Sequence, residues 1–218
     1  MLNAKKATGG GGSTIPAMDP GTYPARLVVV AGLGLQKQRP YKGEPKDPRE
    51  ELLTVYEFLD EFLVDEDGNE VKDKPRWLTD RFPFFNLNSE KAKSTKRYVA
   101  LDPNLTYDGD WSGLIGTPCM VTISKDEGSN GKTYNNITNV SAMRPKEADK
   151  AADLVNEPLV FDPDEPDMEV FKKLPEWVQK IIQEGLEFKG SKLDQLLSGS
   201  QEHTEHEPED QDEEDESW

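Results

Sequence analysis

The loop between residues 36 and 49 combines basic side chains with an aromatic ring. It contains five basic residues and three prolines, and Tyr41 lies among the cations. Lysine and arginine neutralise phosphates, and an aromatic face stacks on bases without reading their sequence. This composition is typical of a surface that follows a nucleic-acid backbone. A solvated connector between two strands would have the same composition, and the loop alone does not separate the two interpretations.

Residue types that many catalytic sites need are scarce. Cys119 is the only cysteine, which excludes an internal disulfide and a cysteine-based zinc site, and its apolar neighbours predict a buried thiol. The two histidines, His203 and His206, lie in the acidic C-terminal segment, so a histidine triad or metal cage within the folded part is excluded. A metal-dependent nuclease would need clustered carboxylates, and four lie in loop-like sequence: Asp108, Asp110, Asp162 and Asp164. Solvated acids are the default there, so we expect no enzyme and no cofactor.

The segment from Gln201 to Trp218 contains ten of the 43 acidic residues and no lysine or arginine. Such dense like charge predicts a disordered tail, because repulsion and a lack of apolar surface prevent folding. An inert solubility tail is the plain interpretation. The terminal tryptophan favours an interaction tail, whose expected partner-binding residues are Glu213, Glu214, Asp215, Glu216 and Trp218. The net charge of −17 therefore resides largely in the tail and does not exclude a nucleic-acid partner.

Three strands are expected in the first half of the chain. Residues 21–35 are rich in β-branched side chains, and glycines within this run mark a bulge or sharp bend. A nucleotide-binding glycine loop is disfavoured there, because no helix follows and the Walker lysine is missing. Residues 51–64 fit a helix nearly as well as a strand. Their Val, Tyr, Phe and Thr content, and the Asp67-Gly68 turn, favour a hairpin with a strand over 76–87. Pro83 within that strand predicts an edge position or a break there.

A helix and a second hairpin are expected next. Asn88 or Ser89 would cap a basic helix that ends at Asp102-Pro103. Strands are predicted over residues 114–124 and 134–143. Beyond them, residues 148–155 read as a short helix or a linker, and residues 168–185 show helical spacing of apolar side chains. Pro175 predicts two short helices there, which we expect to pack on the barrel; binding a partner or a second copy is the alternative.

The order strand, strand, strand, helix, strand, strand is that of an OB fold, a small Greek-key barrel. We predict a mainly β chain with added helices, built on a five-stranded OB-fold-like barrel. The expected parts are a flexible N-terminal arm (1–14), the barrel domain (15–145), a helical extension packing on the barrel (146–198) and the disordered acidic tail (199–218).

An OB barrel binds strands across its second and third strands, flanked by the loops after the first and fourth. The residues expected to contact nucleic acid are Lys37, Arg39, Tyr41, Lys42, Arg76, Trp77, Arg81, Lys125 and Lys132. Tyr41 and Trp77 would stack on bases, and the cations would neutralise phosphates. The basic residues of the predicted helix either extend this track or merely solvate the helix: Lys91, Lys93, Lys96 and Arg97. Most of the phenylalanines and Tyr56 are expected in the core.

Four stretches carry a resemblance to a known family: PRWLTDRFPFFNLNSEKAKSTKRYVALDP (75–103), WSGLIGTPCMVTIS (111–124), GKTYNNITNVSAM (131–143) and EPLVFDPDEPDMEVFKKLPEWVQKIIQEGLEF (157–188). With these stretches, residues 50 to 188 resemble bacteriophage single-stranded DNA-binding proteins. The resemblance implies an OB-type barrel that coats single-stranded DNA in phage replication or recombination. It also implies an acidic tail with a terminal aromatic residue, and residues 213–218 look like one.

These expectations define the partners. Single-stranded DNA is the expected ligand, and a phage polymerase, helicase or recombination protein is the expected partner of the tail. The tail would compete with DNA for the basic groove, so deleting residues 201–218 should tighten DNA binding. No apolar run reaches the ~20 residues of a membrane span, and no signal-peptide core is present, which predicts a cytoplasmic protein in the infected host. A homo-oligomer is compatible with the sequence. The alternative function is an acidic interaction or scaffold protein that binds a basic protein and no nucleic acid.

Overall fold

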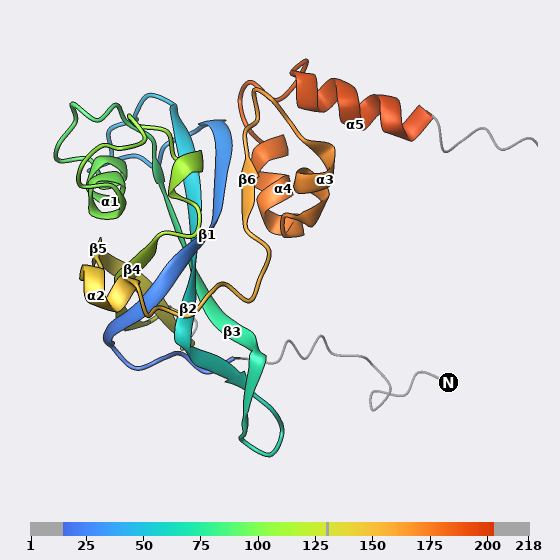
Figure 1. Cartoon of the computed structure of the whole chain (residues 1–218). Coiled ribbons are helices and arrows are strands. Elements are labelled where there is room, and N and C mark those ends of the chain that lie inside the picture. Colours follow the sequence, from blue (N-terminus) through green and yellow to red (C-terminus); the bar gives the residue numbers. More distant parts are fainter. Residues whose placement is uncertain (1–14, 130, 203–218) are drawn as a thin grey trace, which may run out of the picture. The chain divides into compact units, whose positions relative to one another are not determined.

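The computed structural model describes residues 15–129 and 131–202, which form a six-stranded antiparallel open sheet and five helices (Figure 1). The strands are β1 (Gly21–Gln36), β2 (Arg49–Val64), β3 (Glu70–Pro83), β4 (Pro118–Glu127), β5 (Thr133–Ala142) and β6 (Leu159–Phe161). The helices are α1 (Lys93–Leu101), α2 (Pro145–Ala148), α3 (Met168–Lys173), α4 (Glu176–Gln183) and α5 (Lys192–Glu202), with a 3₁₀ turn at Ser112–Leu114. The mainly β prediction with added helices is confirmed.

The strands are ordered β3-β2-β1-β4-β5 in the sheet, and the short β6 pairs with β1 off this path. β1 and β4 are antiparallel with Ala25 opposite Cys119, and β4 and β5 are antiparallel with Val121 opposite Val140. A register shift between Thr122 and Ile123 marks a β-bulge. The strands β3 and β5 are the two edges of this sheet, so closure into a barrel is not confirmed.

The chain forms two compact units. One comprises the chain up to Ala31 together with Leu52–Val160, and the other comprises Gly32–Glu51 together with the chain from Phe161 onward. The long strands β1 and β2 each contribute residues to both units.

The core of the first unit is built on aromatic rings. Even-numbered residues of β2 point to one face of the sheet, which buries Tyr56 and Phe58 completely. Phe82 of β3 lies 5.9 Å from Trp111 between ring centroids, and Tyr98 of α1 lies 5.5 Å from the same indole. The remaining core side chains come mainly from β1, β4 and β5 and include the buried Cys119, as expected. Burial raises the pKa of this thiol to about 12.

The start of α1 differs from the sequence prediction, whereas the break at Pro83 is as predicted. Strand β3 is an edge strand and ends at Pro83, because proline has no N–H to donate to a ladder. The predicted cap at Asn88 or Ser89 is wrong: α1 begins at Lys93, and its N-cap is Ala92, without a side-chain cap. The C-terminal end is as predicted, with the Asp102 N–H donating to the Tyr98 carbonyl at 2.8 Å.

The second unit contains the C-terminal helices. Helices α3 and α4 are separated at Leu174 and Pro175, as predicted, because proline cannot continue a helical hydrogen-bond ladder. Gln36, at the end of β1, is buried and donates from Nε2 to the Ile181 carbonyl at 3.0 Å. The Leu186 N–H donates to a β1 carbonyl at 2.8 Å, which ties the end of α4 to that strand. Strand β6 and helix α5 were not predicted.

Candidate nucleic-acid interface

A tight turn holds Tyr41 within the basic loop between β1 and β2. Tyr41 and Glu44 exchange two backbone hydrogen bonds, at 2.9 and 3.0 Å. The two residues between them, Lys42 and Gly43, have φ angles of 54° and 85°. Positive φ at both central positions is the geometry of a type I′ turn, which glycine adopts freely and lysine rarely. The turn therefore fixes the backbone from Tyr41 to Glu44 and so places one aromatic side chain at its first position.

Two ammonium groups lie over the ring of Tyr41. Lys42 Nζ is 5.4 Å from the ring centroid, Lys46 Nζ is 5.0 Å from it, and the tyrosine is 61% exposed. Cation–π attraction at such exposed sites is worth about 0.5–1 kcal/mol per pair. Lys37 and Arg39 are also exposed on the chain that leads into the turn. Lys46 was not in the predicted contact set, although its place in the same basic loop was a usable signal.

On β3 the predicted contact residues divide between two faces of the strand. Trp77 is 51% exposed and shares the outer face with the exposed Arg81, because residues an even number of positions apart on a strand point to the same face. Arg76 lies on the opposite face, half-buried, and donates from Nη2 to the Pro16 carbonyl at 2.5 Å. Burial lowers the pKa of Arg76, although the nearby Glu61 carboxylate opposes that shift. The prediction that Arg76 joins Trp77 on one surface is therefore corrected.

The hairpin of β4 and β5 carries Lys125 and Lys132 near its turn. Lys125 Nζ lies 3.2 Å from the Asp19 carboxylate, and the backbone carbonyl of Lys132 accepts a hydrogen bond from the Gly128 N–H at 2.8 Å. Asp126 lies in the same hairpin, and a side-chain hydrogen bond from Asn136 is the main reason that its pKa is lowered. Acidic neighbours therefore offset part of the positive charge at this end of the unit.

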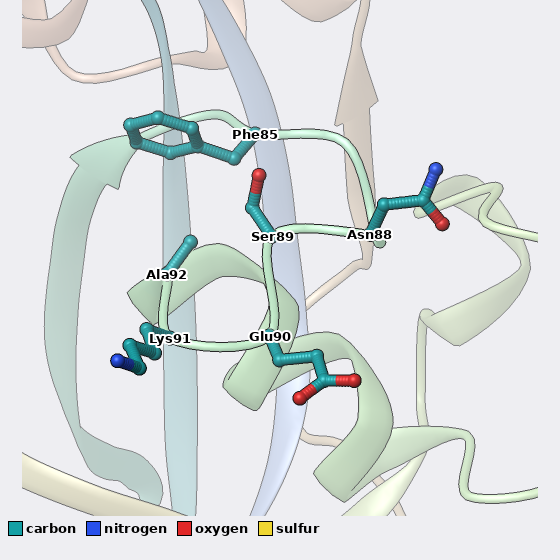
Figure 2. A pocket seen from close by; sticks show the side chains of 6 residues that line it. All are labelled: Phe85, Asn88, Ser89, Glu90, Lys91 and Ala92. Carbon is teal, nitrogen blue, oxygen red and sulfur yellow. The ribbon is translucent and has the colours of Figure 1, made fainter.

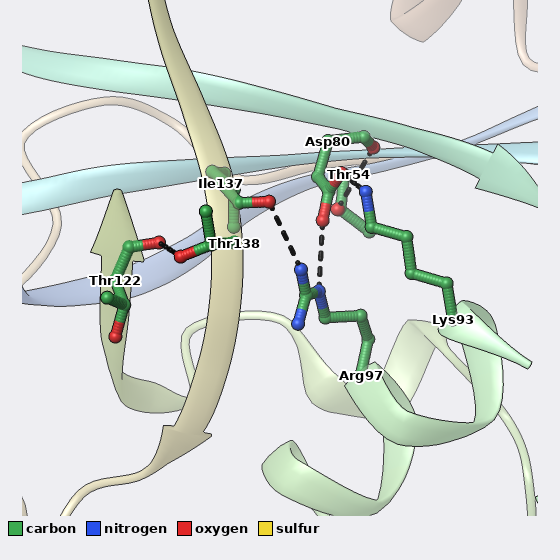
Figure 3. Close-up of polar contacts among 7 residues, drawn as sticks. All are labelled: Thr54, Asp80, Lys93, Arg97, Thr122, Ile137 and Thr138. Atoms are coloured by element: carbon green, nitrogen blue, oxygen red, sulfur yellow. Dashed lines mark hydrogen bonds and ion pairs between the residues drawn. The ribbon is translucent and has the colours of Figure 1, made fainter. Parts of the chain in front are cut away.

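The cations of α1 fall into two classes. Arg97 is 3% exposed and donates from Nε to Asp80 on β3 at 3.0 Å and from Nη2 to the Ile137 carbonyl on β5 at 3.4 Å (Figure 3). Lys93 also pairs with Asp80. Arg97 thus joins the two edges of the open sheet from inside, and neither cation is placed to hold a phosphate. Lys91 and Lys96 are exposed.

The loop after α1 is organised by one buried carboxylate. Asp102 accepts hydrogen bonds from the N–H groups of Thr106 and Tyr107 at 2.8 and 2.9 Å. Burial alone would raise the pKa of Asp102, but these hydrogen bonds outweigh it and hold the pKa below its ordinary value. Leu105 and Asp108 adopt positive φ in this loop, and Tyr107 is 47% exposed.

Two of the four carboxylates considered for a nuclease, Asp110 and Asp162, have local structural roles. Asp110 accepts from the N–H and the hydroxyl of Ser112 at 2.8 and 2.7 Å, and Asp162 accepts from the N–H of Asp164 at 2.9 Å. Across the described part of the chain, no three His, Cys, Asp or Glu side chains are grouped so as to hold a metal ion. None of the helices between residues 15 and 202 has the length and apolar character needed to cross a membrane.

The nine predicted contact residues are divided between the two units. Lys37, Arg39, Tyr41 and Lys42 belong to the second unit, and Arg76, Trp77, Arg81, Lys125 and Lys132 belong to the first. The predicted partner-binding residues at positions 213–216 and 218, and the predicted N-terminal arm, lie outside the described residues. In comparisons with known proteins, the chain matches no family model and no curated protein.

Proposed function

We propose that this chain binds single-stranded DNA, largely without sequence preference, and has no catalytic activity of its own. The strand order β3-β2-β1-β4-β5, with α1 between β3 and β4, is the order expected for an OB fold. The bridge that Arg97 makes between β3 and β5 supports a barrel-like arrangement of these strands. OB folds bind single strands through exposed aromatic side chains and cations along their grooves.

The observation that carries the proposal is the Tyr41 turn. An exposed aromatic ring with ammonium groups 5.0 and 5.4 Å from its centroid presents a stacking surface and phosphate-binding charge at one point. A base stacked on Tyr41 would leave its flanking phosphates near Lys42 and Lys46. Trp77, on the outer face of β3 with Arg81, supplies a second aromatic side chain beside a cation. Stacking and phosphate contacts of this kind do not discriminate between bases.

A role in phage replication or recombination follows from the sequence resemblance, as does action in the host cytoplasm. The acidic tail would then compete with DNA and recruit a polymerase, helicase or recombination protein.

Replacing Tyr41 by alanine tests the proposal. We expect Y41A to weaken binding to oligo-dT about tenfold, because stacking one base on an aromatic side chain is worth roughly 1–3 kcal/mol. The measurement is fluorescence anisotropy of a labelled oligonucleotide titrated with the full chain at constant salt. The melting temperature of the variant should equal that of the unsubstituted chain, because Tyr41 is mostly exposed.

Tyr107→Ala is the matched control. Tyr107 is exposed to a similar extent, 47%, but its neighbours in the loop include Asp108 and Asp110 instead of lysines. We expect Y107A to change DNA affinity less than twofold. Equal losses of oligo-dT affinity in Y41A and Y107A, or an unchanged affinity in Y41A, would contradict the proposed role of the turn. If the unsubstituted chain fails to bind oligo-dT, the function as an acidic interaction protein is favoured instead.

A further inference from the structure

A preformed hollow lies in the segment between β3 and α1, and none of the nine predicted DNA-contact residues lines it. It is an open depression of about 600 Å³ and is lined by Phe85, Asn88, Ser89, Glu90, Lys91 and Ala92 (Figure 2). This volume falls within the ~300–1,000 Å³ typical of small-molecule sites. A single base with its sugar is smaller than most ligands of such sites, so the hollow has room for one nucleotide.

Backbone hydrogen bonds hold the wall of this pocket in place. The Phe85 N–H donates to the Ser94 hydroxyl at 3.1 Å, and the Ala92 N–H donates to the Ser89 carbonyl at 2.8 Å. The chain between these residues therefore runs in fixed turns that end on the first turn of α1. A ligand that binds here does not have to order the loop, which lowers the entropic cost of binding.

The lining combines one aromatic ring with few polar groups. In Figure 2 the Ser89 hydroxyl and the Ala92 methyl group are directed toward the side on which the Phe85 ring lies. The Asn88 amide, the Glu90 carboxylate and the Lys91 ammonium group point away from that ring, so Lys91 lies at the outer rim of the depression. An aromatic face with a neighbouring hydroxyl suits a flat heterocycle that stacks and makes a hydrogen bond at its edge.

Charge at the rim distinguishes a nucleotide from other flat ligands. Lys93 and Arg97 are occupied by Asp80, whereas Lys91 is exposed and makes no ion pair with the described residues. A phosphate attached to a base in the pocket would find its countercharge at Lys91. The Glu90 carboxylate disfavours an anion on its own side of the loop, so phosphate binding is directed to the lysine side.

The pocket is also close to the proposed DNA-binding face of β3. Arg81 and Phe85 are four residues apart, so their Cα atoms lie at most about 14 Å from each other. We propose that the Phe85 pocket binds one unpaired base of the DNA strand, with the adjoining phosphate at Lys91. This inference rests on the proposed function and adds a nucleotide subsite to it.

Two substitutions test the subsite. Phe85→Leu keeps an apolar side chain but removes the stacking face, and Lys91→Gln removes the charge while keeping the length of the side chain. We expect F85L to weaken oligo-dT binding about fivefold and K91Q about threefold, each with an unchanged melting temperature. Lys96→Gln is the matched control, because Lys96 is an exposed lysine of the adjoining helix α1 and does not line the pocket. It should change the affinity less than K91Q does.

A photo-crosslinking measurement is independent of these affinities. Iodouracil-substituted oligo-dT, irradiated with the full chain, should form a crosslink at Phe85 that mass spectrometry of tryptic peptides detects. Unchanged affinity for F85L and K91Q, without a crosslink in residues 85–92, would overturn the subsite while oligo-dT binding by the unsubstituted chain leaves the proposed function standing. Absence of oligo-dT binding by the unsubstituted chain would overturn both.

Discussion

The Asp102 carboxylate couples the loop after α1 to pH. Its hydrogen bonds from Thr106 and Tyr107 hold the pKa below the ordinary value, against the opposing effect of burial. A carboxylate with a lowered pKa in the folded state stabilises the fold above its pKa in the unfolded chain. That stabilisation is lost as the pH falls through the folded-state pKa. The loop should therefore loosen in acid, below about pH 4.

Asp102→Asn should lower the melting temperature at neutral pH, because the amide replaces a charged acceptor of three hydrogen bonds, from the Thr106 and Tyr107 N–H groups and the Tyr98 hydroxyl. The difference from the unsubstituted chain should shrink as the pH falls through the folded-state pKa of Asp102, which lies below the ordinary carboxyl value of about 4, because the native carboxylate is then protonated as well. Thermal unfolding followed by circular dichroism across this pH range measures it. Asp108→Asn is the control, since Asp108 is exposed and asparagine tolerates its positive φ. A difference in melting temperature between D102N and the unsubstituted chain that stays constant with pH would contradict this account.

The sequence predicts the role and the exposure of some site residues better than of others. Tyr41 was predicted as a stacking residue because it lies among lysines, but the cation positions over its ring depend on a turn that Lys42 and Gly43 form. The division between Arg76 and Trp77 could have been predicted, because adjacent residues of a strand point to opposite faces. The burial of Arg97 could not, because its partner Asp80 is distant in sequence.

At the level of elements, α1 joins the two edges of the sheet through one side chain. Arg97→Met should lower the free energy of unfolding by about 3 kcal/mol, because it leaves the buried Asp80 with Lys93 alone and removes a donor from the Ile137 carbonyl. Urea unfolding followed by circular dichroism gives this difference. Lys96→Met, at an exposed site of the same helix, should change the stability by less than about 0.5 kcal/mol. Equal losses of unfolding free energy in Arg97→Met and Lys96→Met would show that the Arg97 bridge does not stabilise the fold.

The long elements could be predicted because their signals are local. The β-branched run of β1, the Asp67-Gly68 turn after β2 and the proline between α3 and α4 act within a few residues. Strand β6 has only three residues and exists through its pairing with β1, which no local pattern reveals. Helix α5 contains Ser198 and Gly199, which have lower helix propensity than alanine, so its sequence resembles a linker. The start of α1 was misplaced because Asn88 and Ser89 are equally suited to turns.

At the level of the whole molecule, the proposed function depends on local positive charge in a chain whose net charge is −17. Net charge governs solubility and long-range steering, whereas a strand bound in a groove responds to the cations within a Debye length, about 8 Å at physiological salt. The basic loop around Tyr41 and the outer face of β3 are two places where cations accompany exposed aromatic rings. A strand bound at either place would release counterions from its phosphates.

The salt dependence of oligo-dT binding by the full chain tests this claim most directly. Each phosphate neutralised on a single strand contributes about −0.7 to the slope of log Kobs against log salt concentration. Contacts from Lys42, Lys46 and one further cation predict a slope of about −2, measured by anisotropy titrations at several sodium chloride concentrations. Binding that is absent, or that keeps the same affinity at every salt concentration, would contradict the account.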